Sequence, residues 1–190
     1  MPNDLVLKQL IASAQVLGLQ NDPSLPASDR QILRMADEEK RALSPAEIQQ
    51  ICQSSKVDAQ LIEQLQGKAN HLVQQAREFL LKEQPHLVQP GGALFPSARA
   101  EACWRDCWQF FRVIVYAIAC KQDQFTDPEG MGALLALYAH VGVPIEGLNI
   151  ALKRLKVLSE QEVSGAIEAQ LLSDSFMHLL KELNKTAVKY

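Results

Sequence analysis

The segment from Pro90 to Cys120 constrains the fold of this chain more than any other part of it. It begins with Pro90-Gly91-Gly92, a typical turn sequence, and Pro96-Ser97 then marks the start of a helix. The residues that follow form the longest strongly apolar segment of the chain, which predicts a central, buried helix. One face of this helix carries a cation, two thiols and a carboxylate at helical spacing: Arg99, Cys103, Asp106 and Cys107. Because charged groups are costly to bury alone, we expect this face to meet a ligand or a partner.

Apolar residues recur at helical spacing along the rest of the chain and indicate an all-α protein. Ser44 and Glu47 form a capping-box pattern around Pro45, which predicts a helix start. Gly18 is expected to end the first helix, and Gly142 to break the helix before Pro144. The sequence has no strand-like alternation and no Asn-Gly hairpin signal. The predicted helices cover residues 5–17, 29–43, 44–54, 57–82, 97–120, 132–140, 144–158 and 159–183.

The composition limits the classes of partner that the chain can bind. Its net charge is −3 and its isoelectric point is about 5.8, so there is no basic field for nucleic acid or an anionic membrane. Hydrophobic residues make up 47% of the chain and charged residues 22%, which predicts a folded protein. Arg112 interrupts the most apolar segment, so no membrane span is expected. Because the first residues lack a signal-peptide pattern, we expect a cytoplasmic protein.

Several short motifs follow one another in a fixed order. Pro90-Gly91-Gly92 is followed by Ala102-Cys103-Trp104-Arg105-Asp106, then by Arg112 and Tyr116, and then by Tyr138-Ala139-His140-Val141-Gly142-Val143-Pro144-Ile145. In this order and spacing the chain resembles the phycobiliproteins, and the allophycocyanin subunits most closely. The resemblance extends over roughly residues 62–156 and implies a globin-like helical bundle.

The resemblance also implies a ligand, a linear tetrapyrrole (bilin) such as phycocyanobilin. In this family the cysteine of the Ala-Cys-x-Arg-Asp motif forms a thioether to the bilin, which is Cys103 in this chain. By the same correspondence, Arg105 would pair with a propionate and Asp106 would accept hydrogen bonds from pyrrole N–H groups. Arg99, one turn before Cys103, is a second candidate for a propionate. A carboxylate that faces several N–H donors would hold a protonated, extended π-system.

A domain organisation follows from the same resemblance. Residues 44–190 are expected to form a single globin-like core, and residues 1–43 an N-terminal helical extension of the kind that family members use to dimerise. Arg112 and Tyr116 are candidates for the interface between subunits. The expected partner is a second copy of the chain or another phycobiliprotein-like subunit.

Two functions within the family remain open, with a third outside it. The chain could carry a bilin on Cys103 as a phycobilisome subunit, or it could resemble the pigment-free bilin biosynthesis-associated globins, which act beside bilin-making enzymes. We favour the pigment-free function, because Trp104 and Trp108 could fill the space of a pigment and Ala93 replaces a polar residue near it. The third alternative is a structural dimerisation module whose central face is simply packed.

Other ligands and activities have less support from the sequence. Cys103 and Cys107 could supply half of a zinc site, and one histidine in a globin-like context could bind haem iron. The histidines lie near loops, helix breaks or polar neighbours, so we expect ordinary solvated or helix-capping side chains at His71, His86, His140 and His178. No Ser-His-Asp pattern, phosphate-binding loop or dinucleotide-binding pattern is present. We therefore expect a protein that is not an enzyme and that has no metal site.

Overall fold

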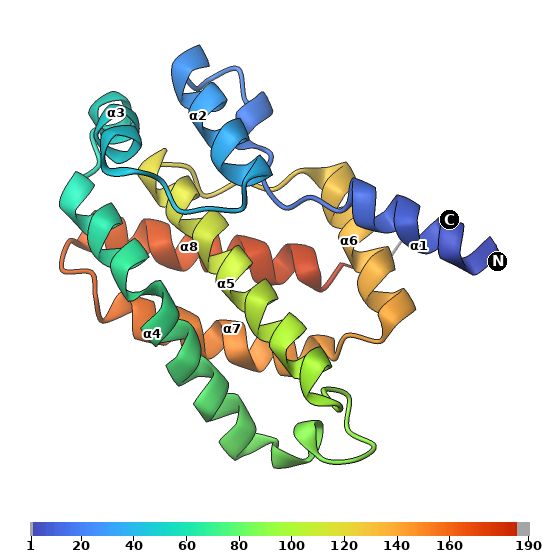
Figure 1. The fold of residues 1–190 in the computed structure, drawn as a ribbon. Coiled ribbons are helices and arrows are strands. Elements are labelled where there is room, and N and C mark those ends of the chain that lie inside the picture. The colour runs from blue at the N-terminus through green and yellow to red at the C-terminus, as the bar shows by residue number, and fades with distance from the viewer. Residues whose placement is uncertain (1, 186–190) are drawn as a thin grey trace.

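The computed structural model describes residues 2–185 and confirms an all-α fold (Figure 1). Within this range there is no β-strand, and Leu17 and Thr126 form an isolated antiparallel bridge. The α-helices are α1 (Pro2–Ser13), α2 (Ala27–Glu38), α3 (Pro45–Ser55), α4 (Ala59–Glu83), α5 (Ser97–Ala119), α6 (Pro128–Val141), α7 (Ile145–Glu160) and α8 (Ala166–Leu183). Two short 3-10 helices, η1 (Leu19–Asn21) and η2 (Pro85–Val88), lie in the connections.

Helix α5 is the central element of the bundle. In Figure 1 it runs diagonally through the molecule, and it packs against α4, α8, α7 and α3. From Phe110 to Ala119 every side chain is buried, because this half of the helix is apolar on all sides apart from Arg112. The first half, from Ser97 to Gln109, keeps exposed positions and carries the four residues predicted to bind the bilin. The fold thus buries one half of α5 on all sides and leaves part of the other half exposed.

Local sequence signals set several helix boundaries as predicted. The capping box at the start of α3 is confirmed: the Ser44 side chain accepts from the Glu47 amide, and the Glu47 carboxylate accepts from the Ser44 amide at 2.7 Å. Asp58 and Asp127 cap α4 and α6 in the same way, each accepting from a backbone N–H group in the first turn. Gly142 ends α6 with a left-handed conformation at φ 70°, which favours glycine.

The prediction that Gly18 ends the first helix is wrong, because α1 already ends at Ser13. Gly18 instead allows two segments to come together. Its backbone N–H group donates to the carbonyl oxygen of Phe125 at 2.7 Å, and a Cβ atom at this position would lie 2.7 Å from the carbonyl oxygen of Thr126. A side chain at position 18 would therefore separate the chain after α1 from the segment before α6.

The end of the chain also differs from the prediction. Helix α7 continues to Glu160, and α8 begins at Ala166, seven residues later than the predicted start at Ser159. Gly165, in extended conformation, precedes α8. The apolar residues on both sides of this connection continue at helical spacing, so the sequence pattern alone does not reveal the break.

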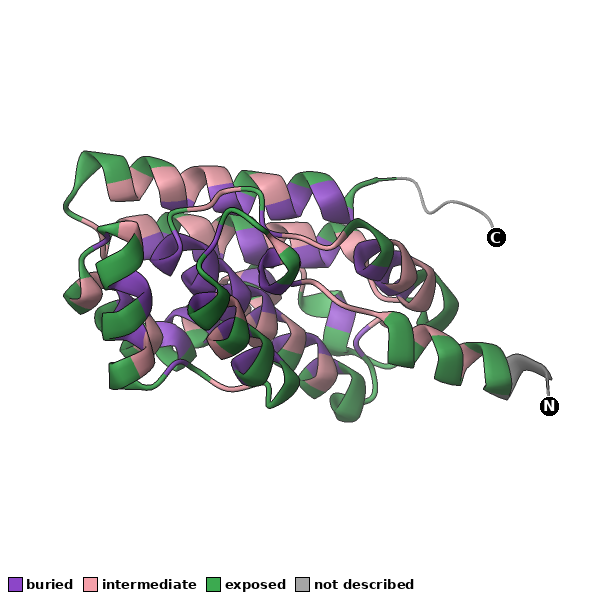
Figure 2. Cartoon of the chain, turned by 90° about the horizontal axis from the view of Figure 1, so that it is seen from above, coloured by how far each residue is buried: buried purple, intermediate pink, exposed green. Residues whose placement is uncertain are grey.

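The N-terminal extension folds onto the rest of the same chain. Helix α1 packs along α6, and α2 packs on η1 and α3. Figure 2 shows that α1 is mostly exposed and projects from one end of the molecule. In residues 2–185, no helix is both long enough and apolar enough to cross a membrane.

Candidate functional site

A largely apolar hollow lies beside the first half of α5. Its volume is about 530 Å³, which is within the range of pockets that hold organic ligands. Its walls come from α5, from the end of α6 and the turn after it, from the loop before α5, and from α1. The polar groups of its lining are Arg99, Cys103, Arg105, Asp106 and Tyr138. The structure therefore brings all four predicted ligand-binding residues to one hollow, together with a tyrosine that the sequence analysis did not assign to the site.

Cys103 is buried at the base of this arrangement, one helical turn before Cys107. A hydrogen bond from Cys107 lowers the pKa of the Cys103 thiol, although burial and the charge of Asp106 act in the opposite direction. The same hydrogen bond, together with burial, raises the pKa of Cys107 well above its usual value. Cys103 lines the hollow and Cys107 does not, so Cys103 is the thiol of the pair that borders the ligand space.

Asp106 and Tyr138 form the polar centre of the hollow. The Tyr138 hydroxyl donates to Asp106 Oδ2 at 2.8 Å across the space between α5 and α6. Burial raises the pKa of Asp106, while the hydrogen bond from Tyr138 and the charge of Arg105 oppose this shift. The carboxylate has a donor on one side and the hollow on the other, so it can accept further hydrogen bonds from N–H groups. Tyr138 is the first residue of the motif that ends in Gly-Val-Pro-Ile. Its place in that motif was the sequence feature that could have indicated a role in the site.

The two arginines of the site are used differently. Arg99 donates from Nε to the carbonyl oxygen of Ala93 and from Nη2 to those of Val141 and Gly142, each at 2.9 Å. It therefore ties the loop before α5 and the end of α6 to α5. Arg105 is exposed and makes no hydrogen bond or ion pair within residues 2–185. Of the two, Arg105 is the guanidinium that remains available for a ligand carboxylate.

The two tryptophans do not fill the hollow, so that part of the sequence analysis is wrong. Trp104 and Trp108 line a neighbouring groove of about 250 Å³ on the α4 side of α5, which shares Arg105 with the hollow. The Arg77 guanidinium from α4 lies 5.3 Å from the centre of the Trp104 ring, an ordinary cation–π distance. Residues 103 and 104 are neighbours in sequence and therefore lie about 100° apart around the helix, which directs them to different surfaces.

Arg112 and Tyr116 lie outside this hollow, in the interior of the chain. The Arg112 side chain is only 3% exposed and forms an ion pair with Asp37 of α2 at 2.7 Å. It also donates to the Tyr116 hydroxyl at 2.8 Å and to Gln109, while that hydroxyl donates to the carbonyl oxygen of Arg41. Their polar groups thus join α5 to the N-terminal extension of the same chain. An interface role for these two residues stays a prediction. Because both are buried inside the chain, they could affect an interface only by holding the N-terminal extension in place.

The haem and zinc alternatives gain no support from the geometry. No histidine lines the hollow beside Cys103, and three of the four histidines, His71, His86 and His140, are exposed. The Nε2 atom of His178 lies 2.8 Å from the hydroxyl of Thr126, and the ring packs on Phe125. Among residues 2–185, no three His, Cys, Asp or Glu side chains come together as a metal ion would require.

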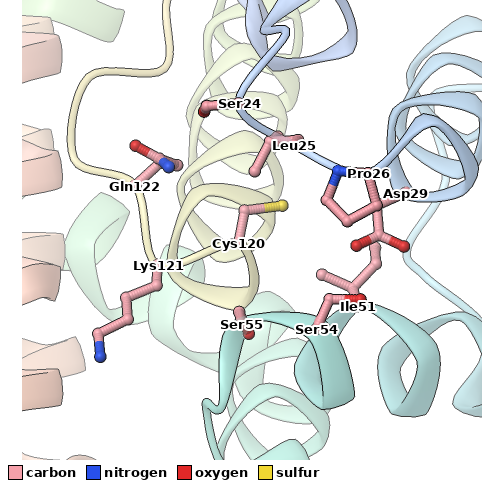
Figure 3. A pocket seen from close by; sticks show the side chains of 10 residues that line it. All are labelled: Ser24, Leu25, Pro26, Asp29, Ile51, Ser54, Ser55, Cys120, Lys121 and Gln122. Atoms are coloured by element: carbon pink, nitrogen blue, oxygen red, sulfur yellow. The ribbon is translucent and has the colours of Figure 1, made fainter.

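A second hollow lies at the other end of α5, where α2, α3 and the residues after α5 meet (Figure 3). Its volume is about 260 Å³, half that of the first hollow. Figure 3 shows the Cys120 sulfur directed toward Pro26 and Asp29. Burial raises the pKa of Cys120 to about 12, so this thiol stays protonated at neutral pH. Asp29 accepts from the Gln50 side chain at 3.3 Å and lies in the first turn of α2, where a carboxylate is favourable. The two reactive groups of this hollow, the Cys120 thiol and the Asp29 carboxylate, therefore need no ligand to explain them.

Comparison with known proteins identifies the class of the chain. The fold is the globin-like fold of the phycobiliproteins. A solved structure of a far-red fluorescent biliprotein, derived from an allophycocyanin F subunit of Chroococcidiopsis thermalis, matches with a TM-score of 0.60. That match covers 67% of this chain and 96% of the other at 20% identity, so it bears on the fold alone. The sequence profile of the phycobilisome protein family matches residues 31–183, and the chain belongs to this family.

Relatives with known names agree with this assignment. The chain is 30% identical to "Allophycocyanin subunit beta-18" of Nostoc over 126 residues, which is 65% of this chain and 75% of the relative. It is 26% identical to "Allophycocyanin alpha subunit" of Picosynechococcus over 133 residues, 68% of this chain and 83% of the relative. The match to "C-phycocyanin beta chain" of Aglaothamnion neglectum reaches 32% over 98 residues, 52% of this chain and 57% of the relative.

Proposed function

We propose that this chain is a non-catalytic bilin carrier of the phycobilisome type, with the pigment attached to Cys103. The observation that carries the proposal is the hollow of about 530 Å³ that Cys103, Arg105 and Asp106 all line. Family membership and the names of the relatives support the same ligand class. Bound there, a linear tetrapyrrole such as phycocyanobilin would supply absorption of visible light.

The residues of the hollow fit the chemistry of such a ligand. Its apolar walls suit the conjugated rings, and Arg105 suits a propionate because its exposed guanidinium forms no hydrogen bond or salt bridge within the described residues. Asp106, already held by Tyr138, suits the pyrrole N–H groups. The Cys103 thiol can add across a carbon–carbon double bond, so that a C–S and a C–H bond replace the S–H and π bonds. This addition needs no oxidant or reductant.

The pigment-free function favoured by the sequence now has weaker support. It depended in part on Trp104 and Trp108 filling the pigment space, whereas both residues lie on the α4 side of α5. Action beside bilin-making enzymes has no support in the fold or in the names of the relatives. We therefore place the pigment-carrying function first, and the pigment-free auxiliary function becomes the alternative outcome of the test.

The test is production of the full chain in cells that also make phycocyanobilin, followed by visible absorption and zinc-induced fluorescence on a denaturing gel. Wild-type protein is expected to carry pigment that survives denaturation, and Cys103→Ala is expected to carry none. Cys120→Ala is the matched control, because Cys120 is an equally buried thiol at the far end of the same helix. A colourless wild-type product, or undiminished pigment on Cys103→Ala, would overturn the proposal.

A further inference from the structure

Helix α1 forms one wall of the hollow that contains Cys103. Leu7 and Ile11 of α1 line this hollow together with residues of α5 and α6. They are four residues apart and therefore lie on the same face of the helix. The family profile begins at residue 31, so this wall comes from a part of the chain outside the matched region. The site is thus extended by an element that the family match does not include.

The position of α1 is fixed by backbone contacts just after its end. The Gln15 amide donates to the carbonyl oxygen of Gly130, and the Asp127 amide donates to that of Val16 at 2.9 Å. A Cβ atom on Gly130 would lie 2.4 Å from the Gln15 carbonyl oxygen, so only glycine permits this approach. Because Gly130 lies in the first turn of α6, these contacts set α1 against the helix that also carries Tyr138. The wall is therefore built into the fold.

The exposure of the α1 side chains indicates that the wall is apolar and incompletely covered. Ile11 is 58% exposed although it borders a largely apolar hollow, and Leu7 is half-buried. A ligand in the hollow would remove part of this apolar surface from water, which favours binding. Leu5 is 62% exposed on the same helix but does not line the hollow. Leu5 and Leu7 of α1 therefore offer a comparison between a leucine outside the hollow and one that lines it.

We propose that α1 is a wall of the pigment site, in which Leu7 and Ile11 contact the apolar part of a bound linear tetrapyrrole and restrict its conformation. This inference rests on the proposed function. The same hollow is also lined by the polar residues Arg105 and Asp106, which come from α5. The chain would therefore hold an amphiphilic pigment between a polar face on α5 and an apolar face on α1. A pigment restrained on both sides loses less excitation energy to internal rotation and fluoresces more strongly.

The experiment compares Leu7→Ala/Ile11→Ala with Leu5→Ala in the full chain, each produced together with phycocyanobilin. In the double variant we expect a lower fluorescence yield per attached pigment and a smaller ratio of red to near-ultraviolet absorption. Affinity for added phycocyanobilin, measured in a Cys103→Ala background so that no covalent bond forms, should fall about tenfold, or about 1.4 kcal/mol. Leu5→Ala should match wild type in all three measurements. A second variant, Ile11→Trp, adds bulk at an exposed position and should reduce pigment loading without disturbing the core.

The outcomes separate this inference from the proposed function. Pigment on wild-type protein with unchanged spectra and affinity in the double variant would overturn the role of α1 and leave the Cys103 assignment standing. Equal losses in Leu5→Ala and in the double variant would also overturn it, because the effect would then not depend on the hollow. A wild-type chain that takes up no pigment would overturn both.

Discussion

Replacement of Asp37 by alanine tests whether the Arg112 network holds the N-terminal extension to the core. The variant would leave the Arg112 guanidinium, 3% exposed in the wild type, without its carboxylate partner at 2.7 Å. Removing one partner of a buried ion pair typically costs about 3–5 kcal/mol. Arg112 keeps its hydrogen bonds to Gln109 and the Tyr116 hydroxyl, so we expect the lower end, about 3 kcal/mol. In a chain of this size that corresponds to a fall in melting temperature of about 6–12 °C.

The assay is urea unfolding followed by far-ultraviolet circular dichroism, with thermal melting as a second measurement. Lys40→Met is the control, because Lys40 pairs with the same carboxylate at 3.4 Å but its side chain is 55% exposed. That variant should lose about 0.5 kcal/mol or less. The double variant Asp37→Leu/Arg112→Met removes both charges and should recover most of the stability lost in Asp37→Ala. A free energy of unfolding for Asp37→Ala within about 0.5 kcal/mol of wild type would refute the reasoning, since surface pairs cost no more than that.

Two further predictions concern pH and have opposite signs. Hydrogen bonds from Arg41 lower the pKa of Glu47 from 4.5 to about 2, so Glu47 stabilises the fold above pH 4.5 and this contribution is lost as the pH falls toward 2. Glu47→Gln should therefore flatten the acid limb of the unfolding free energy, and an unchanged limb would exclude this role. Burial raises the pKa of Asp106 above 3.8. The protonated Asp106 carboxyl therefore contributes to the free energy of unfolding at low pH, and this contribution is lost as the pH rises through the folded-state pKa. Tyr138→Phe removes a hydrogen bond that opposes this shift, and the carboxyl titration followed by NMR should move to higher pH, whereas an unmoved titration would contradict it.

Much of the candidate site could be predicted because its residues lie close together on one helix. The spacing of Arg99, Cys103 and Asp106 requires only that residues 97–120 be helical, and helical periodicity then places them on one side. The capping box at Ser44 was equally predictable, since it depends on residues within one turn. Local patterns of this kind do not depend on how distant segments pack.

The features that were missed depend on contacts between distant segments. Gly18 looked like a helix end, yet its role is to let residues 15–18 approach residues 125–130. The partner of Asp106 is Tyr138, 32 positions later, and the partner of Arg112 is Asp37, 75 positions earlier. A sequence pattern can show that a buried charge needs a partner, but it does not show which of many candidates the fold supplies.

The internal Asp37–Arg112 pair also limits how a second subunit could dock. Residues 1–43 remain the predicted dimerisation extension, but Asp37 of α2 already pairs with Arg112, and the Arg41 carbonyl after α2 accepts from Tyr116, within one chain. A partner that replaced α2 at this position would have to supply its own carboxylate for a guanidinium that is otherwise buried. A partner that left α2 in place would have to use outward surfaces, such as that of α1, which is mostly exposed in Figure 2. Pairing through the extension therefore requires either that the two subunits exchange their α2 helices or that they meet through the outer surface of the extension.

The two halves of α5 explain why a site with charged groups can exist on the central helix. The half from Phe110 to Ala119 is buried on all sides, and α5 as a whole packs against α4, α7 and α8. This half contains the buried ion pair of α5, in which Arg112 is paired with Asp37 of α2. The half from Ser97 to Gln109 needs no such compensation, because Arg105 stays in water and Asp106 has a hydrogen bond from Tyr138. Substitutions at Arg105 and Asp106 should therefore alter ligand binding more than stability, and substitutions of the enclosed residues from Phe110 to Ala119 should do the reverse. It is this separation that makes Cys103→Ala and Asp37→Ala independent tests of the site and of the fold.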